Sequence, residues 1–277
     1  MPYDLIAVGD VMLDGALPAP VEGGRVHGRI DLRAGGSAAN AAIAAASLGA
    51  RAAVIGRVGA DPASRLVADA LAAAGVEPLL ARDARAHTGC VVVVGGTSIV
   101  ADPGASVRLA PQDLPPTLEA GAVLVSGYSL LQPGPEPAAR AALERARTEC
   151  LAVDAASARL VATFGADRFL EATSPAGILL ANVEEARALT GLDAAEAALA
   201  LARRYRIACV KLGRAGALAA ADGQITRAEV QPLDRADTLG AGDAFAGGFL
   251  FFLSRGVDLA AALGAGCDLA TAALSER

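Results

Sequence analysis

The sequence predicts an α/β fold built on a mostly parallel sheet. Short apolar runs of strand length alternate with alanine- and leucine-rich stretches of helical length over most of the 277 residues. Such alternation is typical of crossover connections between parallel strands. Two further segments have the pattern of a half-buried strand and of a hairpin, and they interrupt the alternation. We therefore expect a small second sheet outside the main layer.

The strands and helices of the main layer can be assigned in chain order from hydrophobic periodicity. Near the N-terminus, strands are expected at residues 5–11 and 52–58, and helices at residues 37–48 and 63–74. The later elements are strands at residues 122–126, 151–154, 178–180 and 207–212, and helices at residues 137–149, 183–190, 194–205, 241–253 and 259–273.

The second sheet is expected from two segments. Residues 24–34 alternate between charged and apolar side chains, as a strand with one buried face does. Residues 90–94 and 97–101 flank Gly95 and Gly96, a pair that accepts the positive φ angles of a tight hairpin turn. The charged positions of the first segment are Arg25, His27, Arg29, Asp31 and Arg33. We expect segments at about 15–34 and 87–102 to form a lid; the alternative is that they are edge strands of the main sheet.

Composition and charge exclude several classes of function. The 30 acidic residues exceed the 24 basic ones and give a net charge of −6, so no basic surface for nucleic acid is expected. Four cysteines without a C-x-x-C pair argue against a zinc site or a disulfide framework and fit a reducing cytoplasm. No basic segment precedes an apolar one at the N-terminus, and no apolar run approaches the roughly 20 residues that a bilayer requires. We predict a cytoplasmic protein without nucleic-acid or membrane partners.

Several common catalytic motifs are absent. The single lysine, Lys211, does not follow a glycine loop, which excludes a Walker-type phosphate loop. The glycines at 240–242 and 264–266 do not extend into a dinucleotide fingerprint. Two histidines and no G-x-S-x-G motif give poor support to a Ser-His-Asp hydrolase. Any chemistry must therefore use carboxylates and backbone groups.

The most informative motif is Asp237-Thr238-Leu239-Gly240-Ala241-Gly242-Asp243, which precedes an apolar helical stretch. The small residues Gly240, Ala241 and Gly242 leave backbone amides uncovered at the positive end of that helix, and this arrangement favours an anion. Asp243, in the first turn, suits removal of a proton from a hydroxyl that attacks a phosphoryl group. A structural Asp at a helix start behind a glycine turn is an equally good interpretation of the local sequence.

A second glycine turn, at residues 34–40, also leads into a helix, with Ser37 as candidate N-cap. Asn40 is a polar residue among Ala, Ile and Leu, and its amide suits either a sugar hydroxyl or a neighbouring loop. Asp14 follows the first predicted strand, at the sheet edge where ligands of open α/β folds bind. A turn-forming Asp before Gly15 is the alternative.

Asn182 and Glu185 follow the strand predicted at residues 178–180. Asn182 can cap the next helix, and Glu185 at the N3 position completes a capping box. The functional alternative is that Glu185 orders magnesium-bound water around a triphosphate.

Three motifs in this order resemble the landmarks of the ribokinase-like sugar kinase family of the phosphofructokinase-B type. They are Gly-Gly-x-x-x-Asn at 35–40, Asn-x-x-Glu at 182–185 and Asp-Thr-x-Gly-Ala-Gly-Asp at 237–243. Other segments, including residues 56–61 and 211–216, extend the resemblance over nearly the whole chain. The resemblance implies one kinase domain over residues 1–277, with three layers in which a mostly parallel sheet lies between helices, a small β lid, and ATP and Mg²⁺ as cofactors.

The resemblance also implies roles for single residues. Asp243 would deprotonate the acceptor hydroxyl, and the amides of Gly240, Ala241 and Gly242 would stabilise the transferring phosphoryl group. The other implied roles are acceptor binding by Asp14, Gly35, Gly36, Asn40 and Tyr128, nucleotide binding by Asn182, Lys211, Gly213 and Gly216, and magnesium binding through water by Glu185.

Two departures from the family pattern concern a monovalent cation. Leu239 replaces a residue that is often polar in relatives, and the chain ends at Arg277, before a glycine-containing tail. Many relatives bind the cation with backbone oxygens from both places. Potassium is a possible activator, but these departures weaken that expectation.

The expected acceptor is a small sugar or sugar acid. The alternatives are a nucleoside or vitamin kinase of the same superfamily and a non-catalytic sugar-binding protein. The chain has 3 Tyr and 6 Phe, with none in the lid segments, which disfavours stacking on a nucleobase; the intact Asp243 disfavours loss of turnover. The basic residues of 24–34 suit an acceptor carboxylate, although solvated charge is the alternative.

The apolar face of the lid and the family resemblance predict a homodimer through the lid.

Overall fold

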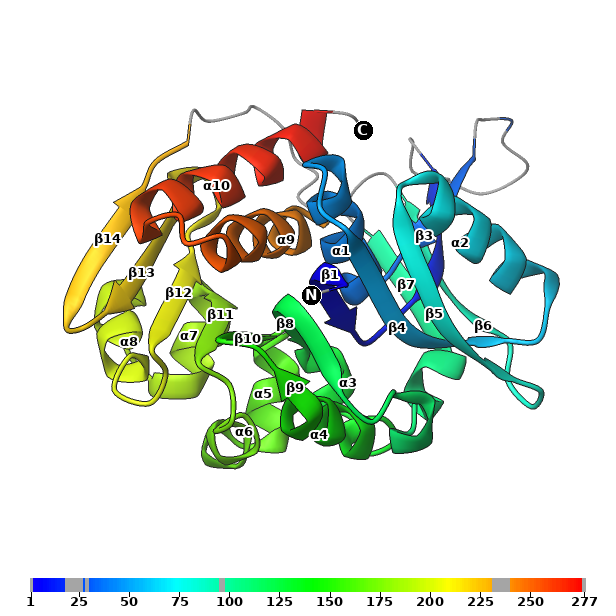
Figure 1. The fold of residues 1–277 in the computed structure, drawn as a ribbon, viewed down its shortest axis with the longest axis horizontal. Helices are drawn as coiled ribbons and strands as arrows, with labels where there is room; N and C mark the ends of the chain where they lie inside the picture. Colours follow the sequence, from blue (N-terminus) through cyan, green and yellow to red (C-terminus); the bar gives the residue numbers. More distant parts are fainter. Residues whose placement is uncertain (1, 18–26, 28–29, 95–97, 231–239, 276–277) are drawn as a thin grey trace.

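The protein forms two β-sheets with helices packed around the larger one (Figure 1). The structure is a computed structural model that describes residues 2–17, 27, 30–94, 98–230 and 240–275. Within these residues, no helix has the length and apolarity needed to cross a membrane.

The main sheet has the strand order β14-β13-β12-β11-β10-β8-β1-β4-β5, and the short β9 pairs with β8. Every pair from β12 to β5 is parallel, whereas β13 and β14 are antiparallel. The strands are β1 (Tyr3–Val8), β4 (Ala52–Gly59), β5 (Val76–Asp83), β8 (Leu118–Ser126), β9 (Ala146–Arg147), β10 (Cys150–Asp154), β11 (Ile178–Asn182), β12 (Ile207–Lys211), β13 (Ala217–Ala221) and β14 (Gln224–Ala228). The predicted mostly parallel sheet is confirmed.

Helices cover both faces of this sheet because the strands of the centre are apolar on both sides. Leu5 and Ala7 of β1 belong to one core and Ile6 and Val8 to the other, as the alternation of side chains along a strand requires. The first core lies under α1 (Ser37–Ser47), α2 (Pro62–Ala73), α9 (Ala241–Ser254) and α10 (Leu259–Ser275). The second lies under α3 (Gly127–Leu130), α4 (Glu136–Arg145), α5 (Ala158–Phe164), α6 (Ala166–Ala172), α7 (Val183–Thr190) and α8 (Ala194–Leu201). The three-layer architecture is therefore confirmed.

The second sheet has the order β3-β2-β6-β7. It consists of β2 (Met12–Leu17), β3 (Asp31–Gly35), β6 (Thr88–Val94) and β7 (Ser98–Gly104). Pairing within this sheet rules out the alternative that the two segments are edge strands of the main sheet. The hairpin predicted over residues 90–101 is present as β6 and β7, and its turn at 95–97 lies outside the described residues, as do residues 18–26 and 28–29.

Several predicted boundaries are wrong. β1 ends at Val8, and residues 12–17 form β2, because Gly9 and Asp10 interrupt the apolar run that was predicted as one strand. The helices predicted at 137–149 and 194–205 end at Arg145 and Leu201. The elements that the sequence analysis did not predict are β2, β5, β9, β13, β14, α3, α5 and α6.

The missed strands have compositions that hide them. β13 has the sequence ALAAA, and alanine is depleted in strands, so its position comes from pairing with β12 rather than from local preference. β5 contains Pro78, which a sheet tolerates because β5 lies at its edge.

Asp61 joins the second sheet to the main body. Its Oδ1 caps α2 by accepting the backbone N–H of Ser64 at 3.0 Å. The same carboxylate accepts the backbone N–H of Thr88 at 2.7 Å and the Thr88 hydroxyl at 2.6 Å. The first residue of β6 is therefore fixed by the residue that begins α2.

We expect Asp61→Ala to lower the free energy of unfolding by about 2–3 kcal/mol, because it removes a helix cap and two hydrogen bonds to Thr88. Denaturant unfolding measures the loss. Asp69→Ala, at an exposed position of the same helix, is the matched control and should change stability by less than about 0.5 kcal/mol. Equal effects of the two substitutions would contradict the role of Asp61.

Candidate active site

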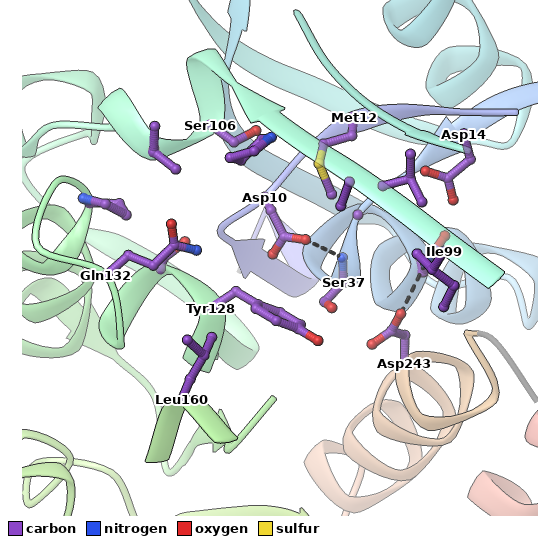
Figure 2. Close-up of a pocket in the computed structure, with 18 residues that line it drawn as sticks. Asp10, Met12, Asp14, Ser37, Ile99, Ser106, Tyr128, Gln132, Leu160 and Asp243 are labelled. Carbon is purple, nitrogen blue, oxygen red and sulfur yellow. Dashed lines mark hydrogen bonds between the residues drawn. The ribbon is translucent and has the colours of Figure 1, made fainter. Parts of the chain in front are cut away.

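A pocket of about 430 Å³ lies between the second sheet and the main body (Figure 2). The second sheet contributes Met12, Asp14, Val91, Ile99 and Ala101 to its lining. From the main body come the loop after β1, the starts of α1 and α9, and residues near α3 and α5; their lining residues are Asp10, Gly36, Ser37, Asn40, Ser106, Tyr128, Ser129, Gln132, Leu160 and Asp243. Four of the five predicted acceptor-binding residues, Asp14, Gly36, Asn40 and Tyr128, thus line one pocket with Asp243, and Gly35 does not line it.

Asp243 lies in the first turn of α9 and is held by Asn40 of α1. The Asn40 Nδ2 donates a hydrogen bond to Asp243 Oδ2 at 2.9 Å. Burial raises the pKa of Asp243 to about 7, with further contributions from Asp154 and Asp10, while the bond from Asn40 opposes the rise. A carboxylate with this pKa can take up and release a proton near neutral pH.

Close packing of α1 against α9 brings these two side chains together. A Cβ on Gly247 of α9 would lie 2.3 Å from the carbonyl oxygen of Ala41 and 3.1 Å from the Cβ of Ala44. Only a glycine at 247 allows this approach, and the alanines of α1 supply the opposing small surface. The alanine-rich composition of α1 therefore serves the position of Asn40.

The helix predicted after the glycine turn is present as α9, and its first turn contains Ala241, Gly242 and Asp243. Gly240 is the N-cap residue with a left-handed φ of 76°, a conformation that favours glycine. Ala241 and Gly242 follow in the first turn, where backbone N–H groups have no partner inside the helix. Residues 237–239 of the motif lie outside the described residues.

Asp10 is a pocket residue that the sequence analysis missed. It is 9% exposed, and its Oδ2 accepts the backbone N–H of Ser37 at 2.7 Å while its Oδ1 accepts the hydroxyl of Ser126 at 2.8 Å. Burial raises its pKa, against these two hydrogen bonds. The prediction of Ser37 as N-cap is wrong, because Gly36 has that position and the Asp10 carboxylate binds the helix start. A carboxylate two residues after the end of β1 was the available signal.

Gly35 and Gly36 let two aspartates approach α1. A Cβ on Gly35 would lie 2.0 Å from the Asp14 carboxyl carbon, and a Cβ on Gly36 would lie 2.4 Å from the Asp10 carbonyl oxygen. Asp14 itself belongs to β2, so the alternative of a turn-forming Asp before Gly15 is wrong.

Tyr128 follows β8 and projects into the pocket (Figure 2). Burial, together with the charges of Asp10 and Asp243, raises the pKa of Tyr128 to about 12. Its hydroxyl therefore keeps its proton at neutral pH and can donate a hydrogen bond.

Asn182 and Glu185 form the predicted capping box. Asn182 Oδ1 accepts the backbone N–H of Glu185, and the Glu185 carboxylate accepts the backbone N–H and the side-chain amide of Asn182, all at 2.8 Å. Glu185 is buried, and burial followed by the Asp154 charge raises its pKa to about 7. The structural interpretation accounts for these bonds.

Lys211 ends β12 beside Asp154, which ends β10. The Lys211 Nζ donates to Asp154 Oδ2 at 2.6 Å. Burial lowers the pKa of Lys211, but the charges of Asp154 and Glu185 outweigh it and raise the pKa above its usual value. The ammonium therefore stays charged at all ordinary pH values.

Gly213 and Gly216 form the turn between β12 and β13. Both have positive φ, and a Cβ on Gly216 would lie 2.0 Å from the carbonyl oxygen of Ala228. Beside this turn lies a second pocket of about 280 Å³, lined by Leu212, Ala215, Ala217, Arg227, Ala228, Glu229 and Val230. None of the four predicted nucleotide residues lines this pocket: Gly213 and Gly216 lie in the turn beside it, whereas Asn182 and Lys211 are paired at the ends of β11 and β12.

Metal ligation by protein side chains alone is not supported. The described residues contain no cluster of three or more His, Cys, Asp or Glu side chains that could hold a metal ion. Mg²⁺ commonly binds through one or two carboxylates together with phosphate oxygens and waters, a mode that the single carboxylate of Glu185 permits.

Several known proteins resemble this chain in sequence or in fold. The model of the pfkB family of carbohydrate kinases matches residues 4–277. A fructokinase of Klebsiella pneumoniae is 31% identical over 81% of this chain and 78% of that protein. A 2-dehydro-3-deoxygalactonokinase of Haloferax volcanii is 29% identical over 99% of this chain and 91% of that protein. The fold is similar, with a TM-score of 0.87 and 18% identity over 99% of this chain and 93% of that one, to a structure described as a ribokinase II from E. coli with ATP and Mg²⁺.

We expect Gly36→Ala to destabilise the protein more than Gly49→Ala. Both glycines have positive φ, so both variants carry a strain of about 1–2 kcal/mol. Only the Cβ at 36 meets a neighbour, the Asp10 carbonyl, and this overlap should cost about 1–3 kcal/mol more. Denaturant unfolding compares the two, and equal losses would contradict the close approach of α1 to Asp10.

Proposed function

The chain belongs to the pfkB family of carbohydrate kinases, and from this premise we propose that it transfers the γ-phosphoryl group of ATP to a hydroxyl of a small sugar or sugar acid, with Asp243 as the base. The observation that carries this proposal is the position of Asp243. It lines the pocket, starts the helix whose N-terminus favours an anion, and has a pKa of about 7.

The reaction follows from the groups around Asp243. The Asp243 carboxylate takes the proton of the acceptor hydroxyl, and the acceptor oxygen forms a bond to the γ-phosphorus. The bond from the γ-phosphorus to the β–γ bridging oxygen breaks, and ADP leaves with that oxygen. The amides of Gly240, Ala241 and Gly242 stabilise the charge on the transferring group, and Asn40 keeps the carboxylate in place.

ATP and Mg²⁺ fit the residues next to the pocket. Asn182 and Lys211 lie at the end of the sheet near the start of α9, and the pocket beside Gly213 and Gly216 suits the rest of the nucleotide. A bound Mg²⁺ would neutralise charge on the triphosphate, with Glu185 holding it through water. The ATP and Mg²⁺ of the similar ribokinase II structure support this assignment.

Two further expectations belong to this proposal. Potassium activation stays a prediction, because Leu239, which departs from the family pattern, lies outside the described residues. The four free thiols fit a reducing cytoplasm as the location.

The acceptor is proposed from the pocket lining. Asp10 and Asp14 offer carboxylate oxygens, which accept hydrogen bonds from sugar hydroxyls. Among the described residues that line the pocket, Tyr128 is the one aromatic residue. A nucleobase would therefore find no pair of rings to stack between. The similar fructokinase and 2-dehydro-3-deoxygalactonokinase act on a sugar and a sugar acid by their names.

A sugar acid would require a cation near the pocket. The described lining residues include no Lys, Arg or His. Arg33 of β3 lies opposite Asp14 of β2, and it therefore shares the pocket-facing side of the second sheet. His27 is exposed, and Arg25 and Arg29 lie outside the described residues. These arginines are the groups that would favour an acidic acceptor.

We expect acceptor-dependent ADP release from a panel of sugars, 2-keto-3-deoxy sugar acids, nucleosides and pyridoxal, with the highest kcat/KM for a sugar or sugar acid. Asp243→Asn should lower kcat by roughly 10²-fold or more, the scale of a lost base. In the wild type, kcat should fall as the pH drops below about 7, because Asp243 becomes protonated.

The stability of Asp243→Asn separates loss of chemistry from loss of folding. Burial raises the pKa of Asp243 to about 7 from 3.8, so its ionisation destabilises the fold progressively between these pH values and fully above them. The uncharged Asn avoids this destabilisation. The Tm at about pH 8 should therefore equal or exceed that of the wild type; near wild-type turnover in this variant would exclude Asp243 as the base.

We also propose that the second sheet acts as a lid and pairs with the same sheet of another copy. Residues directly opposite one another in a sheet share a face, so Val91 and Ala101 face the pocket while Leu32, Val92 and Val100 face away from it. Leu32 is 60% and Val100 69% exposed, and an isologous contact would cover both. Val91 and Val93, on the pocket-facing side of β6, are buried and are not part of this outer surface.

Val100→Asp should shift the wild-type dimer to monomer in sedimentation velocity at micromolar concentration and raise the acceptor KM, since the pocket wall would lose its support. Leu192→Asp, at another exposed apolar position, between α7 and α8, is the control and should remain dimeric. A fully active wild-type monomer would exclude the dimer.

A further inference from the structure

The ammonium group of Lys211, the single lysine of the chain, lies mostly buried in the site rather than at the surface. The Lys211 side chain is 15% exposed and pairs at 2.6 Å with the side chain of Asp154, which is 11% exposed. The other 23 Lys or Arg residues are arginines, and none of them is among the described residues that line the acceptor pocket.

The ammonium lies against the first turn of α9. An ideal Cβ on Gly242 would be 3.3 Å from Lys211 Nζ, so a side chain at 242 would crowd the cation. Electrostatic effects of Lys211 also reach both Asp243 and Glu185, whose pKa values it lowers.

A cation at this place is unfavourable without an anion. The N-terminus of a helix is its positive end and favours negative groups, so an ammonium beside it adds charge of the same sign. Asp154 offsets part of this charge, and its single oxygen contact engages one of the three ammonium protons. Two positive sources that converge on one point form a binding site for a phosphoryl group.

We propose that Lys211 is a catalytic residue of the transfer, whose ammonium donates hydrogen bonds to the oxygens of the phosphoryl group as it passes from ATP to the acceptor. This inference rests on the proposed function and assigns Lys211 to the reacting group rather than to the border of the nucleotide. Asp154 is then a positioning residue that holds the ammonium between β12 and α9.

Removing Lys211 alone does not test this role, because it also leaves the buried carboxylates of Asp154 and Glu185 without their cation. Such a loss destabilises a protein by itself. The Asp154→Asn substitution removes one of these charges, so the double variant Lys211→Met/Asp154→Asn keeps the charge balance and lacks only the contact to phosphate.

The experiment compares kcat, acceptor KM and Tm of the wild type, the two single variants and the double variant. We expect Lys211→Met to lower kcat by roughly 10²–10³-fold, the scale of a lost electrostatic donor, with the acceptor KM nearly unchanged. Asp154→Asn should lose much less, and the double variant should recover Tm but stay as inactive as Lys211→Met. Recovery of kcat in the double variant would overturn the proposal and leave Lys211 as a counter-ion of Asp154.

Nucleotide binding supplies a readout that needs no turnover. Calorimetry with Mg²⁺ present should give a larger loss of affinity for β,γ-imido-ATP than for ADP in Lys211→Met, since the γ-phosphoryl group makes the lost contact. Equal losses would overturn the proposal. Arg203→Met, which removes an exposed cation at the opposite end of β12, is the control and should change neither affinity.

The turnover and binding experiments distinguish failure of the proposed kinase function from failure of the proposed role of Lys211. If the wild type releases no ADP with any acceptor, the proposed function fails, and the binding comparison still decides whether Lys211 contacts the γ-phosphoryl group. If the wild type turns over and Lys211→Met retains its kcat, only the role of Lys211 fails.

Discussion

The contact between α1 and α9 is the constraint on which the site depends. Gly247 and the alanines around Ala41 let the two helices touch through their backbones, so that Asn40 reaches Asp243 although 203 positions separate them. Both helix starts then face the same pocket at the edge of the main sheet. A larger residue at 247 would separate the helices and leave Asp243 without its amide partner.

Crowded carboxylates give the site its chemistry and reduce its stability. Asp10, Asp154, Glu185 and Asp243 are all buried or half-buried near one end of the sheet, with Lys211 as the cation that partly neutralises them. Desolvation, together with the charge of Asp154, raises the pKa values of Glu185 and Asp243 to about 7, which suits proton transfer and which folding opposes. The arrangement is tolerable because a large apolar core supports it on both faces of the sheet.

The sequence analysis succeeded where the determinants are local. The glycine turn before Asp243 and the capping box of Asn182 and Glu185 depend on residues a few positions apart. Asp10 was missed because its hydrogen-bond partner Ser126 lies 116 positions away in the sequence. The pair of Lys211 and Asp154 was missed for the same reason, because 57 positions separate the two residues. Strands of alanine such as β13 were missed for the same reason, since strand pairing rather than propensity places them.

The alternation of side chains along its strands gives the second sheet two different surfaces. Along β7, Ile99 and Ala101 face the pocket, whereas Val100 between them faces outward. One strand therefore presents two surfaces, and a partner that covers Val100 also fixes the backbone that positions Ile99. Asp61 anchors the same sheet to the body through Thr88. Asp61 thus fixes one end of the second sheet to the main body, whereas the outer face of the sheet, with Val100, is exposed and could be covered by a second copy.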